Sequence, residues 1–142
     1  MVVNTQSAKE TFELGKRIGQ GAKAGQIYCL DGDLGVGKTV FTQGFAAGLE
    51  IAEPVSSPTF TIIQEYDCGR LPFYHFDVYR IGAVEEMDEI GYEDYFYGNG
   101  VCLVEWATLI QDILPSEASY ITIKKDPMKG FDFREIQIEE RK

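Results

Sequence analysis

The sequence predicts a domain of the α/β class, and three features support this prediction. An apolar run at 26–30 leads into the glycine-rich segment GDLGVGKT at 32–39, and apolar residues at helical spacing follow at 39–49. Two further runs, 59–66 and 71–79, have the composition of strands joined by a tight turn. The order of strand, glycine loop and helix is typical of α/β domains, whereas the hairpin adds antiparallel pairing.

The remaining elements follow from local patterns along the chain. The SAKE segment has the spacing of a helix capping box and predicts an opening helix over residues 7–20. An acidic stretch at 83–90 is predicted to be helical, and the glycine- and tyrosine-rich segment 91–100 is predicted to be a loop. The most apolar strand candidate lies at 100–105, and a short helix is expected at 109–114. The alternating segments YITIKK and FREIQIEE predict a final hairpin with one solvated face.

The composition restricts the classes of function. The 142 residues carry 13 Lys and Arg against 23 Asp and Glu, so the net charge is -10. This charge argues against direct binding of bare nucleic acid, and any RNA would be held by another subunit. No apolar run approaches the roughly 20 residues that span a bilayer, and MVVNTQSAKE lacks the features of a signal peptide. We therefore expect one cytoplasmic domain, residues 1–142, without a membrane anchor. The cysteines Cys29, Cys68 and Cys102 form no C-x-x-C pair, which favours reduced core thiols.

The segment GDLGVGKT fits the phosphate-loop pattern G-x-x-x-x-G-K-[ST]. Gly32, Gly35 and Gly37 let backbone N–H groups approach phosphate oxygens, and the following helix points its positive end at them. We expect Lys38 to bridge the β- and γ-phosphates and the Thr39 hydroxyl to bind Mg²⁺. The predicted nucleotide-binding residues of this segment are Asp33, Leu34, Gly35, Val36, Gly37, Lys38, Thr39 and Val40.

A phosphate-loop enzyme also needs an acidic residue at the end of a neighbouring strand, where it holds Mg²⁺ or orders the attacking water. Glu105 ends the apolar run VCLVE, so we assign Glu105 to the metal together with Thr39. Asp77 lies late in LPFYHFDVYR and is the candidate for positioning water or for an indirect contact with the metal. The two acidic residues could exchange these roles. Lys38, Asp77 and Glu105 are the predicted catalytic residues.

Three further features near the predicted site have two interpretations each. His75 alternates with Phe73 and Asp77, so the three side chains share one strand face. A hydrogen-bonded structural role is favoured for His75, and a role as base stays open. Trp106 either stacks on a bound partner or packs into the core. The segment SSPTF at 56–60 lies where nucleotide switches sense the γ-phosphate, and turn chemistry explains it equally well.

Taken together and in this order, GDLGVGKT, SPTF, YHFDVYR, EIGYEDYF and LVEWA closely resemble the TsaE (YjeE) family. That family is the ATPase component of the bacterial machinery that makes N6-threonylcarbamoyladenosine (t6A) in tRNA. The resemblance runs from the opening helix to Trp106 and weakens in the tail.

The resemblance implies a P-loop NTPase-like fold, a mixed sheet with helices on both faces, that binds ATP and Mg²⁺ and hydrolyses ATP slowly by itself. The implied partners are the threonylcarbamoyl transferase subunit TsaD and its companion TsaB, which would hold the tRNA while hydrolysis resets their complex. The resemblance also makes Thr39 and Glu105 the metal ligands and Asp77 a functionally sensitive residue. It places Trp106 in the nucleotide site and makes Thr11, in segment 5–11, a candidate adenine contact.

Three other functions compete with this one. A GTPase switch would need an N-K-x-D segment that binds the base, and the sequence has none. A small-molecule kinase would need several arginines in a lid, whereas those of this chain are scattered. They are Arg17, Arg70, Arg80, Arg134 and Arg141. A nucleotide-sensing interaction module with incidental hydrolysis stays open.

Overall fold

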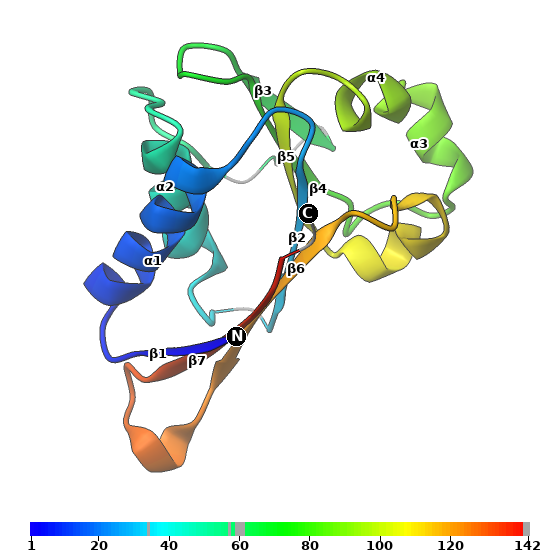
Figure 1. Ribbon diagram of the computed structural model, residues 1–142. Helices are drawn as coiled ribbons and strands as arrows, with labels where there is room; N and C mark the ends of the chain where they lie inside the picture. The colour runs from blue at the N-terminus through cyan, green and yellow to red at the C-terminus, as the bar shows by residue number, and fades with distance from the viewer. Residues whose placement is uncertain (34, 57, 59–61, 141–142) are drawn as a thin grey trace.

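A mixed β-sheet divides the molecule in the computed structural model, which describes residues 1–33, 35–56, 58 and 62–140 (Figure 1). Within these residues, seven strands form one sheet in the order β1-β7-β6-β2-β5-β4-β3. They are β1 (Val2–Thr5), β2 (Ile27–Gly32), β3 (Ile63–Tyr66), β4 (Phe73–Asp77), β5 (Val101–Glu105), β6 (Ser119–Lys125) and β7 (Arg134–Glu139).

Helices cover both faces of this sheet (Figure 1). Helices α1 (Ala8–Gly21) and α2 (Lys38–Gly48) lie on one face. The other face carries α3 (Glu85–Glu89), α4 (Tyr92–Phe96) and the 3-10 helix η1 (Ala107–Ile113). The predicted fold class, a mixed sheet with helices on both faces, is therefore confirmed.

The four central strands run parallel, which brings their carboxyl ends to one edge. β2 pairs in parallel with β5 and β6, and β5 pairs in parallel with β4. All of β5 is buried, as is the apolar start of β2, which explains why both segments are short apolar runs. In register, Glu105 of β5 lies beside Leu30 of β2 and Asp77 of β4. The loop after β2 and the two acidic residues therefore meet at the same edge.

Antiparallel strands complete both sides of the sheet. The predicted hairpin between 59–66 and 71–79 is confirmed where β3 pairs with β4, although 59–61 lie outside the described residues. β6 and β7 form the predicted final hairpin, with a 3-10 turn, η2 (Pro127–Lys129), between them. The sequence analysis missed β1, which pairs antiparallel with β7. Its four residues pair with the far end of the described chain, so no local pattern marks them.

The α1 and α2 helices pack with their backbones in direct contact. The Ser7 hydroxyl accepts a hydrogen bond from the Glu10 N–H at 3.1 Å, so it caps α1 as the SAKE spacing predicts. Glycines stand where the helices touch. A Cβ on Gly15 would lie 2.4 Å from a main-chain oxygen of α2, and one on Gly44 would lie 2.1 Å from a main-chain oxygen of α1. No larger residue fits there, so main-chain contact fixes α2 against α1.

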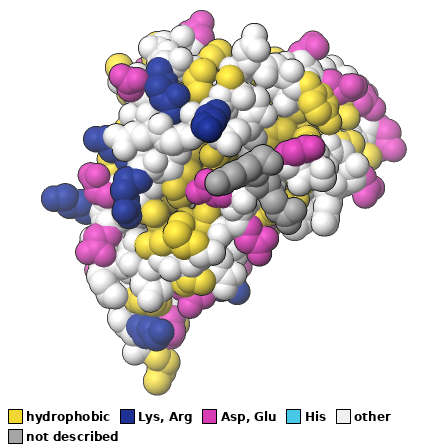
Figure 2. Space-filling view, viewed as in Figure 1, with side chains coloured by type: hydrophobic (Ala, Val, Ile, Leu, Met, Phe, Trp, Pro, Cys, Tyr) yellow, Lys and Arg dark blue, Asp and Glu magenta, His cyan; other side chains and the backbone are white. Residues whose placement is uncertain are grey.

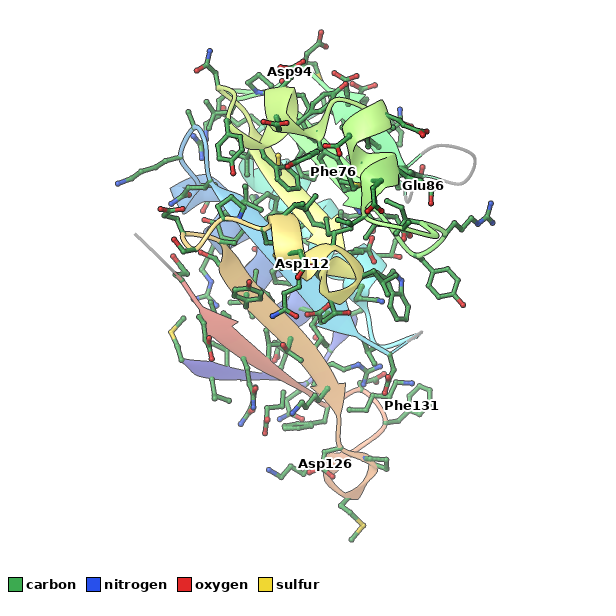
Figure 3. The ribbon with its side chains drawn as sticks, turned by 90° about the vertical axis from the view of Figure 1, so that its right-hand side faces the viewer. Phe76, Glu86, Asp94, Asp112, Asp126 and Phe131 are labelled. Atoms are coloured by element: carbon green, nitrogen blue, oxygen red, sulfur yellow. The ribbon has the colours of Figure 1, made fainter. Side chains whose placement is uncertain are left out.

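Short helices and aromatic side chains cover the opposite face (Figure 3). Phe96 of α4 packs edge-to-face on Phe76 of β4, with the ring centroids 5.3 Å apart. Met87 of α3 is fully buried in the same core cluster. The prediction of a loop at 91–100 is wrong over Tyr92–Phe96, because burial of Phe96 stabilises a helical turn that the neighbouring glycines conceal in the sequence.

The charged residues, the apolar content of the helices and the cysteines can each be placed in this fold. Acidic residues gather on the side of the short helices, where Figure 2 shows them on the right. Within the part of the chain that the structure describes, no helix has the length and apolar character to cross a bilayer. Cys29 and Cys102 are buried free thiols as expected, whereas Cys68 is exposed.

Candidate functional site

The phosphate loop and both acidic residues line one cavity at the carboxyl edge of the sheet. The cavity has a volume of about 470 Å³. Its described lining residues are Gly35, Gly37, Lys38, Thr39, Asp77, Glu105 and Trp106. The loop follows β2, Asp77 ends β4 and Glu105 ends β5, so three neighbouring strands supply the site. The structure thus brings together most of the residues that the sequence analysis selected.

The loop backbone requires glycine at two of its positions. Gly35 and Gly37 have φ angles of 80° and 103°, in the region that L side chains rarely adopt. Gly37 directly precedes α2, and no side chain caps the first N–H groups of that helix. Uncapped N–H groups at a helix start favour an anion, because the helix dipole is positive there. The loop and α2 therefore form a cradle suited to phosphate.

Lys38 and Glu105 form a buried ion pair across the cavity. The Lys38 Nζ lies 3.9 Å from the Glu105 Oε1, and the two side chains are only 8% and 7% exposed. The same Nζ lies 4.6 Å from the centroid of the Trp106 ring. The Lys38 ammonium is thus held between a carboxylate and an aromatic face at the end of β5.

His75 holds the other oxygen of the same carboxylate. Its Nε2 lies 2.7 Å from the Glu105 Oε2, and the histidine is 1% exposed. The buried Nδ1 has no hydrogen-bond partner among the described residues. An ionised carboxylate oxygen can only accept, so the His75 Nε2–H donates to Glu105 in this arrangement. His75 therefore occupies the hydrogen-bonded structural position that the sequence analysis favoured.

Asp77 and Trp106 form the outer rim of the cavity. The Asp77 Oδ1 accepts a hydrogen bond from the Tyr79 N–H at 3.0 Å, which turns the chain away after β4. The Trp106 ring lies 4.8 Å from the Tyr79 ring and packs partly on the second core cluster. Trp106 has a φ of 62°, which is rare for a bulky residue. Both interpretations of Trp106 keep support, since one part packs and another faces the cavity.

The remaining predicted site residues do not line this cavity. Thr11 is 2% exposed, and its hydroxyl is 2.8 Å from that of Thr5. Val40 is half-buried on α2. Asp33 and Val36 line a neighbouring hollow of about 550 Å³. Leu34 lies outside the described residues, as do Ser57 and residues 59–60 of the SSPTF segment.

Sequence reasoning missed the basic residues of the final hairpin. Lys124 and Lys125, at the end of β6, line the same hollow as Asp33 and Val36. Arg134 of β7 donates from its Nε to the Val36 main-chain oxygen at 2.8 Å. The pattern YITIKK could have revealed the lysines, because it ends a strand that runs beside β2. Asp31, at the end of β2, was also missed; burial raises its pKa, and Lys38 acts in the opposite direction.

Comparison with protein families identifies the family of this chain. The family model for "Threonylcarbamoyl adenosine biosynthesis protein TsaE" matches residues 5–135. The chain belongs to the TsaE family. Curated TsaE proteins from Bacillus subtilis (strain 168) and Treponema pallidum (strain Nichols) are similar to it. The first is 52% identical over 93% of this chain and 80% of its own length, and the second is 39% identical over 84% and 88%.

A solved structure has the same fold. The crystal structure of YdiB from Bacillus subtilis superposes with a TM-score of 0.82 at 44% identity, covering 100% of this chain and 86% of that one. The chain therefore has the P-loop NTPase fold. The family and the fold together imply nucleotide binding, and the TsaE family model associates the chain with threonylcarbamoyl adenosine biosynthesis.

Proposed function

We propose that this TsaE-family chain binds ATP with Mg²⁺ in the cavity beside loop 32–39, hydrolyses it slowly, and so supports t6A modification of tRNA by the TsaB–TsaD transferase complex. Residues 1–142 would act as one domain in the cytoplasm. The observation that carries this proposal is the convergence of Lys38, Thr39, Asp77 and Glu105 on one cavity behind a phosphate loop. The net charge of -10 agrees with a role in which the transferase, and not this chain, holds the tRNA.

The side chains of the cavity suit Mg²⁺ bound together with phosphates. Thr39 offers a hydroxyl and Glu105 a carboxylate, and Mg²⁺ prefers oxygen ligands completed by water and substrate phosphates. Among the described residues, no group of three or more His, Cys, Asp and Glu could hold a metal ion. The nucleotide and water would therefore supply the remaining ligands. Bound Mg²⁺ would neutralise charge on the phosphates during transfer.

Lys38 would change partners when a nucleotide binds. Its distance of 3.9 Å from the Glu105 Oε1 is long for a charge-assisted hydrogen bond, so phosphate oxygens would compete well for the ammonium. Glu105 would then be free to hold the metal, while His75 keeps its Oε2 in place. Asp77, anchored through Oδ1 by the Tyr79 N–H, would position the attacking water. The reverse assignment of Glu105 and Asp77 is the alternative.

The small number of cations at the cavity supports the proposal that hydrolysis is slow. Among the described residues that line the cavity, Lys38 is the one cationic side chain. The transition state of phosphoryl transfer spreads negative charge over the equatorial oxygens, and an added arginine accelerates it by about 10³–10⁵ in other NTPases. A partner that brings a cation to the cavity, or moves one there, would therefore raise the rate.

ATP turnover with and without TsaB–TsaD tests the proposal. We expect the partner pair to stimulate turnover, and we expect Glu105→Ala to abolish both hydrolysis and t6A formation in a reconstituted reaction. If the pair leaves turnover unchanged and Glu105→Ala still supports modification, the ATPase function is wrong. A nucleotide-sensing interaction module would then be the better description.

Nucleotide binding can be tested separately through Lys38. ATP with Mg²⁺ should raise the melting temperature of the unaltered protein, because a ligand that binds only the folded state stabilises it. Lys38→Ala should abolish this shift. Lys23→Ala is the charge-matched control, since Lys23 is exposed and outside the lining residues, and it should keep the full shift. A normal shift in Lys38→Ala would contradict the assignment of the phosphates to this loop.

A further inference from the structure

Arg134 joins the final hairpin to the phosphate loop. Its Nε donates to the Val36 main-chain oxygen at 2.8 Å, across 98 residues of sequence. Its Nη1 donates to the carbonyls of Phe131 and Phe133 at 2.9 and 2.7 Å. Phe131 lies near the projecting tip of the hairpin (Figure 3). One half-buried guanidinium thus holds three main-chain oxygens, one of which belongs to the loop.

Val36 is the anchored residue of that loop. Its side chain is 2% exposed within the core cluster that lies under α1 and α2. Its N–H donates to the Asp33 carbonyl at 3.2 Å, and its own carbonyl is held by Arg134. Gly35 and Gly37 on either side have φ angles of 80° and 103°. The backbone therefore turns sharply around a fixed point at Val36.

The hydrogen bond from Arg134 also sets the direction of the next amide. The Val36 C=O and the Gly37 N–H belong to one planar peptide, and in a trans peptide they point in opposite directions. No peptide bond of the described residues is cis. Gly37 lines the cavity, whereas Arg134 is not among the described lining residues and approaches from the hairpin. A carbonyl held toward the hairpin therefore directs the Gly37 N–H away from the hairpin.

We propose that Arg134 is a positioning residue of the nucleotide site, which orients the Gly37 N–H toward the phosphates. This role rests on the proposed function, because it concerns the same cavity. A charged donor on the Val36 oxygen also polarises the peptide, and a polarised N–H is a stronger donor to an anion. Arg134 acts through the backbone and does not itself need to contact the nucleotide. Its loss should weaken the binding of the phosphates more than it weakens the fold.

Arg70 provides a matched control. Its Nη2 donates to the main-chain carbonyls of Gly19, Gln20 and Ala22 at the end of α1. Each arginine therefore holds three main-chain oxygens, and each removal leaves the same number of acceptors without this partner. None of the acceptors of Arg70 belongs to the loop or is among the described lining residues of the cavity.

The test compares ADP binding by Arg134→Met and Arg70→Met with calorimetry. Both variants should melt at a lower temperature, because both lose hydrogen bonds. The Kd for ADP should rise about tenfold in Arg134→Met, as expected for one lost hydrogen bond with a charged group, and should stay within about twofold in Arg70→Met. Arg134→Lys should give an intermediate Kd, because it keeps the charge and loses the fork of donors. If Arg134→Met does not fold, the Kd for ADP is compared between Arg134→Lys and Arg70→Lys instead, and a higher Kd in Arg134→Lys alone supports the positioning role.

A measurement without nucleotide separates this inference from the proposed function. The amide resonance of Gly37 in the nucleotide-free protein should shift in Arg134→Met and stay in place in Arg70→Met. An unshifted Gly37 amide, or an ADP affinity that follows only the loss in melting temperature, would overturn the positioning role while leaving the proposed function intact. An unaltered protein that binds no ADP would contradict the proposed function itself, and this inference with it.

Discussion

The two faces of the sheet are covered in different ways. On one face, α1 and α2 meet backbone to backbone at Gly15 and Gly44, and no side chain separates them at these points. On the other face, helices of five residues and the 3-10 helix η1 are held by side chains such as Phe96 and Met87. Main-chain contacts between long helices leave little freedom, whereas short helices held by side chains can shift and repack.

Because of this difference, the two faces of the sheet contribute to the site in different ways. The phosphate loop leads directly into α2, so the rigid face fixes the cradle. Trp106 and Tyr79 lie on the second face, beside the short helices. The side chains at this rim of the cavity can therefore change position more easily than the phosphate loop. We expect the second face to open locally more readily than the first. Three substitution and labelling experiments test this contrast.

The largest effect is expected on the first face, from Gly44→Ala. The added Cβ would lie 2.1 Å from a main-chain oxygen of α1, so the helices must separate. We expect a loss of about 3 kcal/mol in the free energy of unfolding, measured with urea. Gly21→Ala is the matched control, because nothing lies within 4 Å of its Cβ position. Gly21 is the last residue of α1, so this variant should change the free energy of unfolding by less than about 1 kcal/mol. Equal stability of the two variants would contradict the close packing.

A smaller effect is expected on the second face, from Met87→Ala. Met87 is 0% exposed, and its truncation removes a large side chain from the second cluster. We expect a loss of about 2 kcal/mol, at the low end for such substitutions, because α3 can move inward and fill part of the cavity. The affinity for ADP should stay within about twofold of the unaltered value. A collapse of ADP binding in Met87→Ala would show that the second face also fixes the cradle.

The smallest effect concerns the thiols, which report opening of the second face. Cys29 and Cys102 both belong to the second cluster. Burial raises the pKa of the Cys29 thiol to about 12 and also raises the pKa of the Cys102 thiol. The reactive thiolate is therefore suppressed at pH 8. A thiol reagent should label Cys68 quickly and the other two slowly. Met87→Ala should speed the slow labelling and Gly21→Ala should not. Equal rates in both variants would argue against local opening.

The first face could be predicted from the sequence because its determinants are local. The SAKE capping box, the helical spacing after the loop and the glycine loop each lie within one short segment. The second face could not be predicted as well. Tyr92–Phe96 is helical because Phe96 packs on Phe76, a contact between distant segments that the glycines around it conceal. β1 depends in the same way on its pairing with β7.

The residues of the candidate site also differ in whether local sequence patterns could predict them. Lys38, Thr39, Asp77 and Glu105 could be selected because each follows an apolar strand or sits in a motif, and parallel pairing then brings them together. The hydrogen bond between His75 and Glu105 could only be guessed, since alternation fixes a strand face and not a partner. No local sequence pattern indicates the contact of Arg134, because its acceptor at Val36 is 98 residues away in the sequence.

The pairing of β1 with β7 has a consequence during synthesis. Of the described strands, β1 is synthesised first and β7 last. β1 therefore cannot pair with β7 until nearly all of the chain has emerged from the ribosome. β7 also brings Ile136, which belongs to the core cluster beneath the loop, and the guanidinium that holds Val36. A chain released before β7 would carry the whole phosphate-loop motif and yet lack a finished cradle. Such a fragment would be a substrate for proteases rather than a weaker version of the protein.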